Sequence, residues 1–122
     1  MGRRRPADRL EDIRAAAADV IAFVAGMDEA AFTTLPSSDR RPWRALKNAL
    51  AAIGEAVKDL PFDITARYPG IDWRGFAGLR DVVTHAYFGL DLPRLQPVVA
   101  EEIPALLAAV EAELARLKES GP

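Results

Sequence analysis

The sequence predicts an all-α protein, an up-and-down antiparallel helical bundle of four to five main helices. In three long segments, apolar residues recur at spacings of three and four, which is the periodicity of one helical face. No segment shows the alternating pattern of a half-buried strand, and there is no glycine-rich phosphate loop. The links between these segments are short, which favours antiparallel packing of consecutive helices.

The chain begins with a tail and a long helix. Residues 1–7, with three consecutive arginines, are expected to form a disordered basic tail that is either only solvated or weakly attracted to RNA. A helix is predicted over 8–25, with Gly26 as its stop. Asp28 is placed to cap a short helix over 29–34. The apolar face of the long helix consists of Leu10, Ile13, Ala17, Val20, Ile21 and Val24.

The second long helix has the most regular apolar pattern in the chain. Ser38 or Asp39 is the expected N-cap, Pro42 is tolerated in the first turn, and Pro61 ends the helix. Its stripe resembles that of a coiled coil and favours packing along a neighbouring helix at a shallow angle. The stripe consists of Trp43, Leu46, Leu50, Ile53, Val57 and Leu60.

Residues 61–71 are predicted to connect this helix to the next, with one helical turn over 64–68. Asp72 is then expected to cap a third helix that runs to Gly89. The buried face of this helix is predicted to consist of Trp73, Phe76, Leu79 and Val83.

The last apolar pattern covers residues 92–118. Pro97 and Pro104 interrupt it, and each removes a backbone hydrogen bond, so a kinked helix or two helices meeting near 100–104 are expected. The end of the chain, 119–122, is expected to fray. The stripe consists of Leu95, Val99, Ile103, Leu106, Val110, Leu114 and Leu117.

Length and composition limit the classes of protein that this chain can belong to. With 122 residues, the sequence predicts one domain, over 8–118. The absence of cysteine excludes disulfides and thiolate metal sites, and a single histidine excludes a multi-histidine metal site within one chain. We therefore expect no metal and no cofactor. No apolar run is long enough for a membrane span, so a soluble, cytoplasmic protein is expected. The net charge of −2 provides no global attraction for nucleic acid.

Residues 78–89 carry the densest group of reactive side chains. Arg80, Thr84 and Tyr87 fall within about 40° of one another on an ideal helix and form one polar stripe. Asp81 and His85 are four residues apart and form a second stripe, so the carboxylate can hold the imidazole and fix its tautomer. This pair is also what an ordinary satisfied surface pair looks like.

His85 lies roughly 140° around an ideal helix from Arg80. One straight helix therefore does not bring both groups to one point. Either the helix ends around His85–Tyr87, or a second copy of the chain completes the site. We take the angle as an argument for a dimeric site.

Two residues of the second long helix are further candidates for a cleft at the same site. Asn48 and Glu55 are seven residues apart and therefore share a face, which is not the face of the apolar stripe. They are either solvated or directed at a partner chain.

The chemistry of these groups suits the cleavage of RNA without a metal. An arginine fork binds a phosphodiester and stabilises charge that builds on it, while a histidine moves protons near neutral pH. A tyrosine can stack on a base. The ribose 2′-hydroxyl would be the nucleophile, and the products would be a cyclic phosphate and a 5′-hydroxyl.

Four segments of the chain resemble the HepT-like toxins of the HEPN superfamily. The residues from Arg80 to Tyr87 match its Arg-x4-His-x-Tyr motif. The segment 47–56 is similar to the family segment that ends in Ile-Gly-Glu-Ala, and 68–74 is similar to its Tyr-Pro-x-Ile-x-Trp connector. The step Glu102-Ile103-Pro104 resembles the acidic-apolar-proline step of its last helix. In order and spacing, the resemblance covers roughly residues 8 to 117.

The resemblance implies a HEPN-like bundle that dimerises, with the motifs of both copies lining one cleft. It implies an endoribonuclease toxin of a type VII-like pair, with tRNA or mRNA as substrate and a minimal nucleotidyltransferase as antitoxin. In these terms Arg80 and His85 are catalytic, Asp81 is the supporting polar residue beside the arginine, and Tyr87 receives AMP. From the polar stripe, Thr84 and Tyr87 are expected to be supporting residues as well. Asp81 departs from the asparagine that often follows the arginine in this family.

Three hypotheses follow. The first is the ribonuclease toxin neutralised by adenylylation of Tyr87. The second is a non-catalytic HEPN helical module that binds a nucleotidyltransferase or another partner. The third is a structural helical dimer that uses the apolar stripe of residues 43–60.

Overall fold

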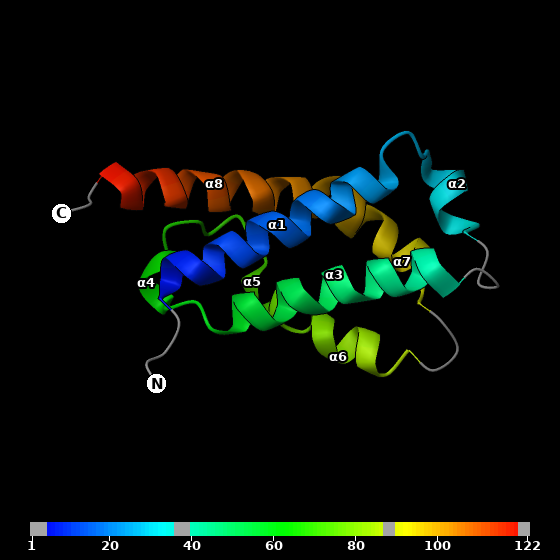
Figure 1. Cartoon of the computed structure of the whole chain (residues 1–122), viewed down its shortest axis with the longest axis horizontal. Coiled ribbons are helices and arrows are strands. Elements are labelled where there is room, and N and C mark those ends of the chain that lie inside the picture. Colours follow the sequence, from blue (N-terminus) through cyan, green and yellow to red (C-terminus); the bar gives the residue numbers. More distant parts are fainter. Residues whose placement is uncertain (1–4, 36–39, 87–89, 120–122) are drawn as a thin grey trace.

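The computed structural model describes residues 5–35, 40–86 and 90–119, which are helical with no strand among them (Figure 1). The prediction of an all-α fold is therefore confirmed. None of the described helices is long and apolar enough to cross a membrane. The elements are α1 (Pro6–Val24), α2 (Glu29–Thr33), α3 (Arg40–Lys58), α4 (Phe62–Thr65), α5 (Trp73–Ala77), α6 (Leu79–Thr84), α7 (Leu92–Pro97), the π-helical segment η1 (Val98–Glu102) and α8 (Ile103–Glu119).

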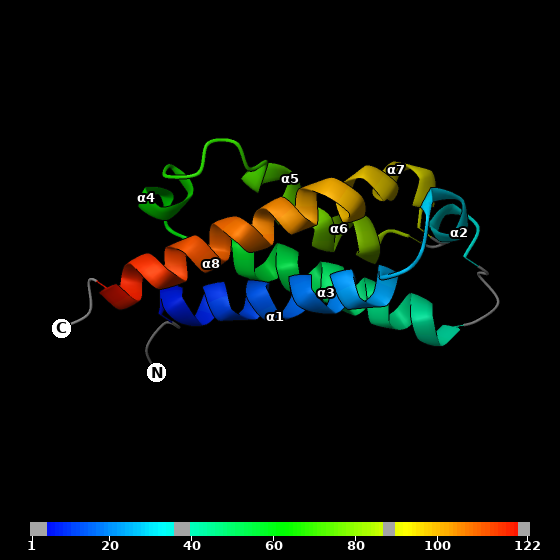
Figure 2. The ribbon, with the colours of Figure 1, turned by 90° about the horizontal axis from the view of Figure 1, so that it is seen from above.

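The expected antiparallel packing holds for α1 against the other two long helices, while α3 and α8 run in the same direction as each other (Figures 1 and 2). Helix α1 packs against both α3 and α8 and runs in the opposite direction to each (Figures 1 and 2). Helices α5 and α6 pack on α3, and α2 packs on α7 at the opposite end of the molecule from the two termini. The residues between α1, α3, α6 and α8 form one apolar core, whose fully buried members include Leu10, Ile13, Leu46, Leu50, Ile53, Ile103 and Leu106.

Local sequence signals predicted the bounds of the first two helices well. Helix α1 begins at Pro6, two residues before the expected start, because proline suits the first turn and the Asp8 carboxylate accepts a hydrogen bond from the Arg5 amide at 3.3 Å. Gly26 follows it with a φ of 82°, the left-handed conformation that favours glycine. Asp28 caps α2 as predicted, since its carboxylate accepts from the Ala31 amide at 2.8 Å.

Helix α3 buries the centre of its predicted stripe. Trp43 is half-buried, and Pro42 stands in the first turn as expected. The helix ends at Lys58, so Leu60 lies beyond it and packs half-buried on the core. The predicted caps Ser38 and Asp39 lie outside the described residues.

The helix that carries the motif differs from the single helix predicted over 72–89. Asp72 caps its start as expected, accepting from the Gly75 amide at 3.0 Å, but Gly78 separates α5 from α6. Helix α6 then ends at Thr84, so the expected stop at Gly89, itself outside the described residues, is not where the helix ends.

A glycine of α3 allows this broken helix to approach. A Cβ atom on Gly54 would lie 2.8 Å from the backbone nitrogen of Arg80 and 3.1 Å from the carbonyl oxygen of Phe76. Both neighbours are backbone atoms of the α5–α6 break and cannot move aside like a side chain. The absence of a side chain at Gly54 therefore determines how closely α6 lies on α3.

The last segment has the expected distortion between its two prolines. Asp91 caps α7 by accepting from the Arg94 amide at 3.3 Å, and the chain then passes through η1 into α8. The wide turns of η1 lie at 98–102, directly after Pro97 and before Pro104, where the regular hydrogen-bond ladder cannot continue. Val99 and Ile103 remain buried, so the apolar stripe continues across the distortion.

A buried carboxylate ties the connector 66–72 to α8. The Glu113 side chain is 1% exposed and accepts from Arg67 Nε at 3.1 Å and Nη2 at 2.6 Å, and from the Tyr68 hydroxyl at 3.0 Å. Arg116, one turn away, donates to both its oxygens. The hydrogen bonds from Arg67 are the main reason that the pKa of Glu113 falls to about 2, against the opposing effect of burial. Trp73 Nε1 donates to the Tyr68 carbonyl at 3.0 Å and secures the far end of the connector.

We predict that Glu113→Gln lowers the free energy of unfolding by about 2–3 kcal/mol at pH 7, because two arginines lose their buried counter-charge while remaining partly exposed. The folded pKa of about 2 lies below the ordinary 4.5, so this contribution is complete above about pH 4.5 and is lost as the pH falls toward 2. Urea unfolding from pH 2 to 7 tests this. The exposed Glu111→Gln on the same helix is the control, and equal effects of the two changes would contradict the prediction.

We predict that Gly54→Ala destabilises the protein by about 1–2 kcal/mol, although alanine is the better helix former, because the new methyl group meets fixed backbone. Gly78→Ala is the matched control, since its Cβ would make only an ordinary 3.5 Å contact with the Gly75 carbonyl. Thermal unfolding measures both. A Gly54→Ala protein as stable as the Gly78→Ala protein would mean that α6 can shift freely on α3.

Candidate active site

The candidate site lies on the solvent-exposed side of α6, next to α3. Arg80, Asp81, Thr84 and His85 are all exposed. Leu79 is buried and Val83 half-buried on the opposite side of the helix. The buried side packs on the core and thereby directs the polar side chains outward. These four groups are therefore accessible from solvent.

Arg80 is paired across the helices with Glu55 of α3. Its Nη1 donates to Glu55 Oε1, and the two side chains are 60% and 50% exposed. Among the described residues, this is the only hydrogen bond of the Arg80 side chain, so its Nε and Nη2 have no protein partner there. Two N–H donors on one edge of the guanidinium thus remain for a ligand.

His85 caps the C-terminus of α6. Its Nδ1 lies 2.8 Å from the main-chain oxygen of Asp81, while the expectation was a contact with the Asp81 carboxylate. The reason is the helix end: the carbonyl of Asp81 belongs to the last turn, four residues before the cap. A carbonyl can only accept, so Nδ1 carries the proton and the neutral ring has its lone pair on Nε2. That lone pair can accept a proton.

The end of α6 bears on the two alternatives for bringing Arg80 and His85 to one point. Helix α6 ends at Thr84, so the helix does stop near His85, as the first alternative requires. Tyr87 lies outside the described residues. The predicted stripe of Arg80, Thr84 and Tyr87 therefore stays a prediction in its last member.

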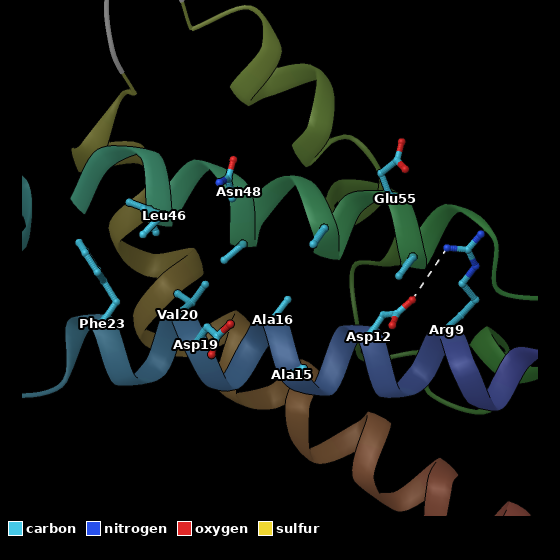
Figure 3. A pocket seen from close by; sticks show the side chains of 14 residues that line it. Arg9, Asp12, Ala15, Ala16, Asp19, Val20, Phe23, Leu46, Asn48 and Glu55 are labelled. Carbon is cyan, nitrogen blue, oxygen red and sulfur yellow. Dashed lines mark ion pairs between the residues drawn. The ribbon is translucent and has the colours of Figure 1, made fainter. Parts of the chain in front are cut away.

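Asn48 and Glu55 of α3 have different surroundings. Both are exposed, both line the groove of about 650 Å³ between α1 and α3, and both side chains project away from α1 (Figure 3). Half of the other lining residues are alanines, and the rest are Arg9, Asp12, Asp19, Val20, Phe23 and Leu46. The structure brings Glu55 to Arg80, while no described contact links Asn48 to the motif.

Sequence analysis did not identify the contact between Gly54 and Arg80. Its signal was present, because an isolated glycine inside a strongly periodic helix often marks close packing. Only the fold shows which backbone comes close to it.

The described residues contain no group of three or more histidine or acidic side chains that could hold a metal ion. The exposed guanidinium of Arg80 can bind an anion, and the imidazole lone pair of His85, at the C-terminal cap of α6, can move a proton.

Comparison with known protein families identifies one match. The model of the family described as "Ribonuclease HepT-like" matches residues 13–113. This range contains α3, α6 and most of α8, and hence Glu55, Arg80 and His85.

Several curated proteins are similar to this chain. "Probable ribonuclease HepT" of Thermococcus cleftensis is 42% identical over 73 residues, 60% of this chain and 66% of that protein. A "Putative RNase" of Methanocaldococcus jannaschii is 34% identical over 110 residues, 90% of this chain and 91% of that protein. Another protein of the same name and organism is 37% identical over 73 residues, and this match spans 60% of each chain.

No solved structure matches the sequence significantly. The assignment to a family therefore depends on sequence similarity, and the family model covers most of the chain. Because the family model spans residues 13–113 and a 34% identical relative is matched over 90% of the chain, this protein belongs to the HepT-like ribonuclease family.

Proposed function

We propose that this protein is a metal-independent endoribonuclease that cleaves RNA by attack of a ribose 2′-hydroxyl on the adjacent phosphodiester. The observation that carries the proposal is the exposure of Arg80 and His85 together on α6, within a chain of a ribonuclease family. Relatives named as ribonucleases support the reaction class.

In the proposed reaction, Nε2 of His85 accepts the proton of the 2′-hydroxyl as its oxygen attacks phosphorus. The bond from phosphorus to the 5′-oxygen breaks, which leaves a 2′,3′-cyclic phosphate and a 5′-hydroxyl. Arg80 binds the phosphate oxygens and stabilises the added negative charge of the transition state. Asp81 acts in support by accepting from Nδ1 through its carbonyl, which keeps the lone pair on Nε2.

The 5′-oxygen needs a proton as it leaves, and one histidine per chain cannot be both base and acid in the same step. We therefore propose a homodimer, in which the same histidine of a second copy supplies that proton. A second copy also adds its arginine. That charge is needed because Glu55 and Asp81 stand beside Arg80 on each chain.

The resemblance to HepT-like toxins supports a biological role for this activity. In this proposal the chain is the toxin of a pair, acts on tRNA or mRNA in the cytoplasm, and is neutralised by a minimal nucleotidyltransferase that transfers AMP to Tyr87. An anionic AMP group two residues after His85 would repel RNA phosphate and block access to the site.

A second candidate function is a non-catalytic HEPN module that binds a nucleotidyltransferase or another partner. One observation favours it: the carboxylate of Glu55 pairs with Arg80, so negative charge lies directly beside the phosphate-binding group. A module of this kind would assemble normally without Arg80 or His85.

We predict that induction of this chain alone arrests bacterial growth and depletes intact RNA, and that Arg80→Ala and His85→Ala each lower cleavage by at least about 100-fold. Growth curves and total RNA on a gel measure this, with circular dichroism and light scattering to check helicity and dimerisation. Arg14→Ala on the outer face of α1 is the charge-matched control, because Arg14 is exposed and its ion pair is with Glu11 one turn away, far in the sequence from α6. Normal growth with soluble wild-type protein would favour the binding module, while cleavage retained in His85→Ala would refute the assigned base.

We predict that co-expression with the proposed nucleotidyltransferase adds AMP to the chain, and that Tyr87→Phe removes the main adduct because its hydroxyl is the acceptor. Intact-protein mass spectrometry measures the adduct. Tyr68→Phe is the control, since Tyr68 is the other tyrosine of the chain and its hydroxyl is occupied by Glu113. An adduct that persists in Tyr87→Phe would place the modified residue elsewhere.

A further inference from the structure

We propose that Glu55 is a positioning residue, which holds one edge of the Arg80 guanidinium so that the opposite edge faces the RNA phosphodiester. The inference rests on the proposed ribonuclease function and deepens it. Two neighbouring residues of α3 carry the argument: Gly54 places the backbone of Arg80, and Glu55 places its side chain.

The backbone contact comes first. A Cβ on Gly54 would lie 2.8 Å from the Arg80 nitrogen, so the first turn of α6 sits directly against α3 at this residue. Gly54 is buried while Glu55, next along the helix, is exposed. The side chain of Glu55 therefore emerges beside the point where Arg80 leaves α6.

The side-chain contact then selects a rotamer. Arginine has many rotamers, and an exposed guanidinium without a partner samples most of them. The hydrogen bond from Nη1 to Glu55 Oε1 restricts this freedom, so a phosphate meets a guanidinium that is already oriented. Exposed ion pairs contribute little to folding stability, so orientation is the larger consequence of this one.

The geometry of the contact leaves the useful donors available. Glu55 occupies Nη1 alone, and the Nε–Nη2 edge presents two parallel N–H groups, which match two oxygens of a phosphate. RNA can bind there without displacing the carboxylate. This separates a positioning residue from a competitor, which would have to leave before RNA could bind.

The charge of Glu55 makes a competing role the natural alternative, and two substitutions separate the two roles. Glu55→Gln removes the charge but keeps an oxygen that accepts the same hydrogen bond. Glu55→Ala removes both. A positioning role predicts that the glutamine variant resembles wild type and the alanine variant does not, whereas competition predicts that both variants bind RNA more tightly.

The first experiment measures steady-state cleavage of a single-stranded RNA by the full-length protein. We expect Glu55→Ala to lower kcat by about ten-fold or more with a much smaller change in KM, because orientation matters most when the extra negative charge develops. Glu55→Gln should restore most of kcat. Glu111→Ala, an exposed acid on α8, controls for the change in net charge and should match wild type.

A second experiment does not depend on cleavage. The Nε–Hε resonance of Arg80 in ¹⁵N-labelled protein, assigned with Arg80→Lys, reports how rigidly the guanidinium is held, and titration with a 2′-O-methyl oligonucleotide reports binding of an RNA that cannot be cleaved. We expect an ordered resonance that shifts with this RNA in wild type and Glu55→Gln, and an averaged one in Glu55→Ala.

The outcomes separate this proposal from the proposed function. Wild-type protein that cleaves no RNA but shows the expected resonance and its dependence on residue 55 would refute the ribonuclease and support the positioning role. Equal losses in both variants would show that charge rather than orientation matters, and gains in both would show competition. Either result, or a resonance unchanged in Glu55→Ala, would overturn the assignment.

Discussion

The close approach of α6 to α3 at Gly54 is the constraint on which the candidate site depends. A side chain at this position would overlap the Arg80 nitrogen and the Phe76 carbonyl, so only glycine allows the two helices to meet at this distance. The contact brings backbone atoms of α5 and α6 directly against α3. It also places Arg80 beside Glu55 and turns the polar face of α6 toward solvent. A mid-helix glycine, which costs helix stability, is thus explained by the site that it creates.

The other end of the bundle is held by charge. Glu113 is buried, yet each of its oxygens accepts hydrogen bonds from arginine, and Tyr68 adds a further one. Loss of the arginines from this cluster would be costly, because a buried carboxylate without its counter-charge is destabilising. It fastens the connector between α4 and α5 to α8, and Trp73 extends this attachment to the start of α5. Both ends of the segment that leads into α6 are therefore fixed, one by Glu113 and the other by Gly54.

The electrostatics around Arg80 shape what the site can do. One arginine accompanied by Glu55 and Asp81 is a weak attractor of RNA, and the whole chain has a net charge of −2. In the proposed ribonuclease, binding of RNA would then come from oriented hydrogen bonds or from groups that a second copy contributes. Membership of the HepT-like ribonuclease family and the exposed histidine both agree with RNA as the ligand, and the tautomer set by the Asp81 carbonyl suits His85 to accept a proton.

The sequence by itself determined the helical class, the order of the helices, the apolar stripes, the caps Asp28 and Asp72 and the polar content of the motif, because these depend on local periodicity and on hydrogen bonds between near neighbours. It also suggested Asn48 and Glu55 as one pair. Only the tertiary structure distinguished them, since Glu55 meets a residue 25 positions away and Asn48 has no described contact with the motif. The break at Gly78 and the end of α6 at Thr84 were likewise seen only in the structure, and the carbonyl contact of His85 follows locally from that helix end. Helical periodicity says which residues share a face, but the distance at which two helices approach depends on the side chains of both.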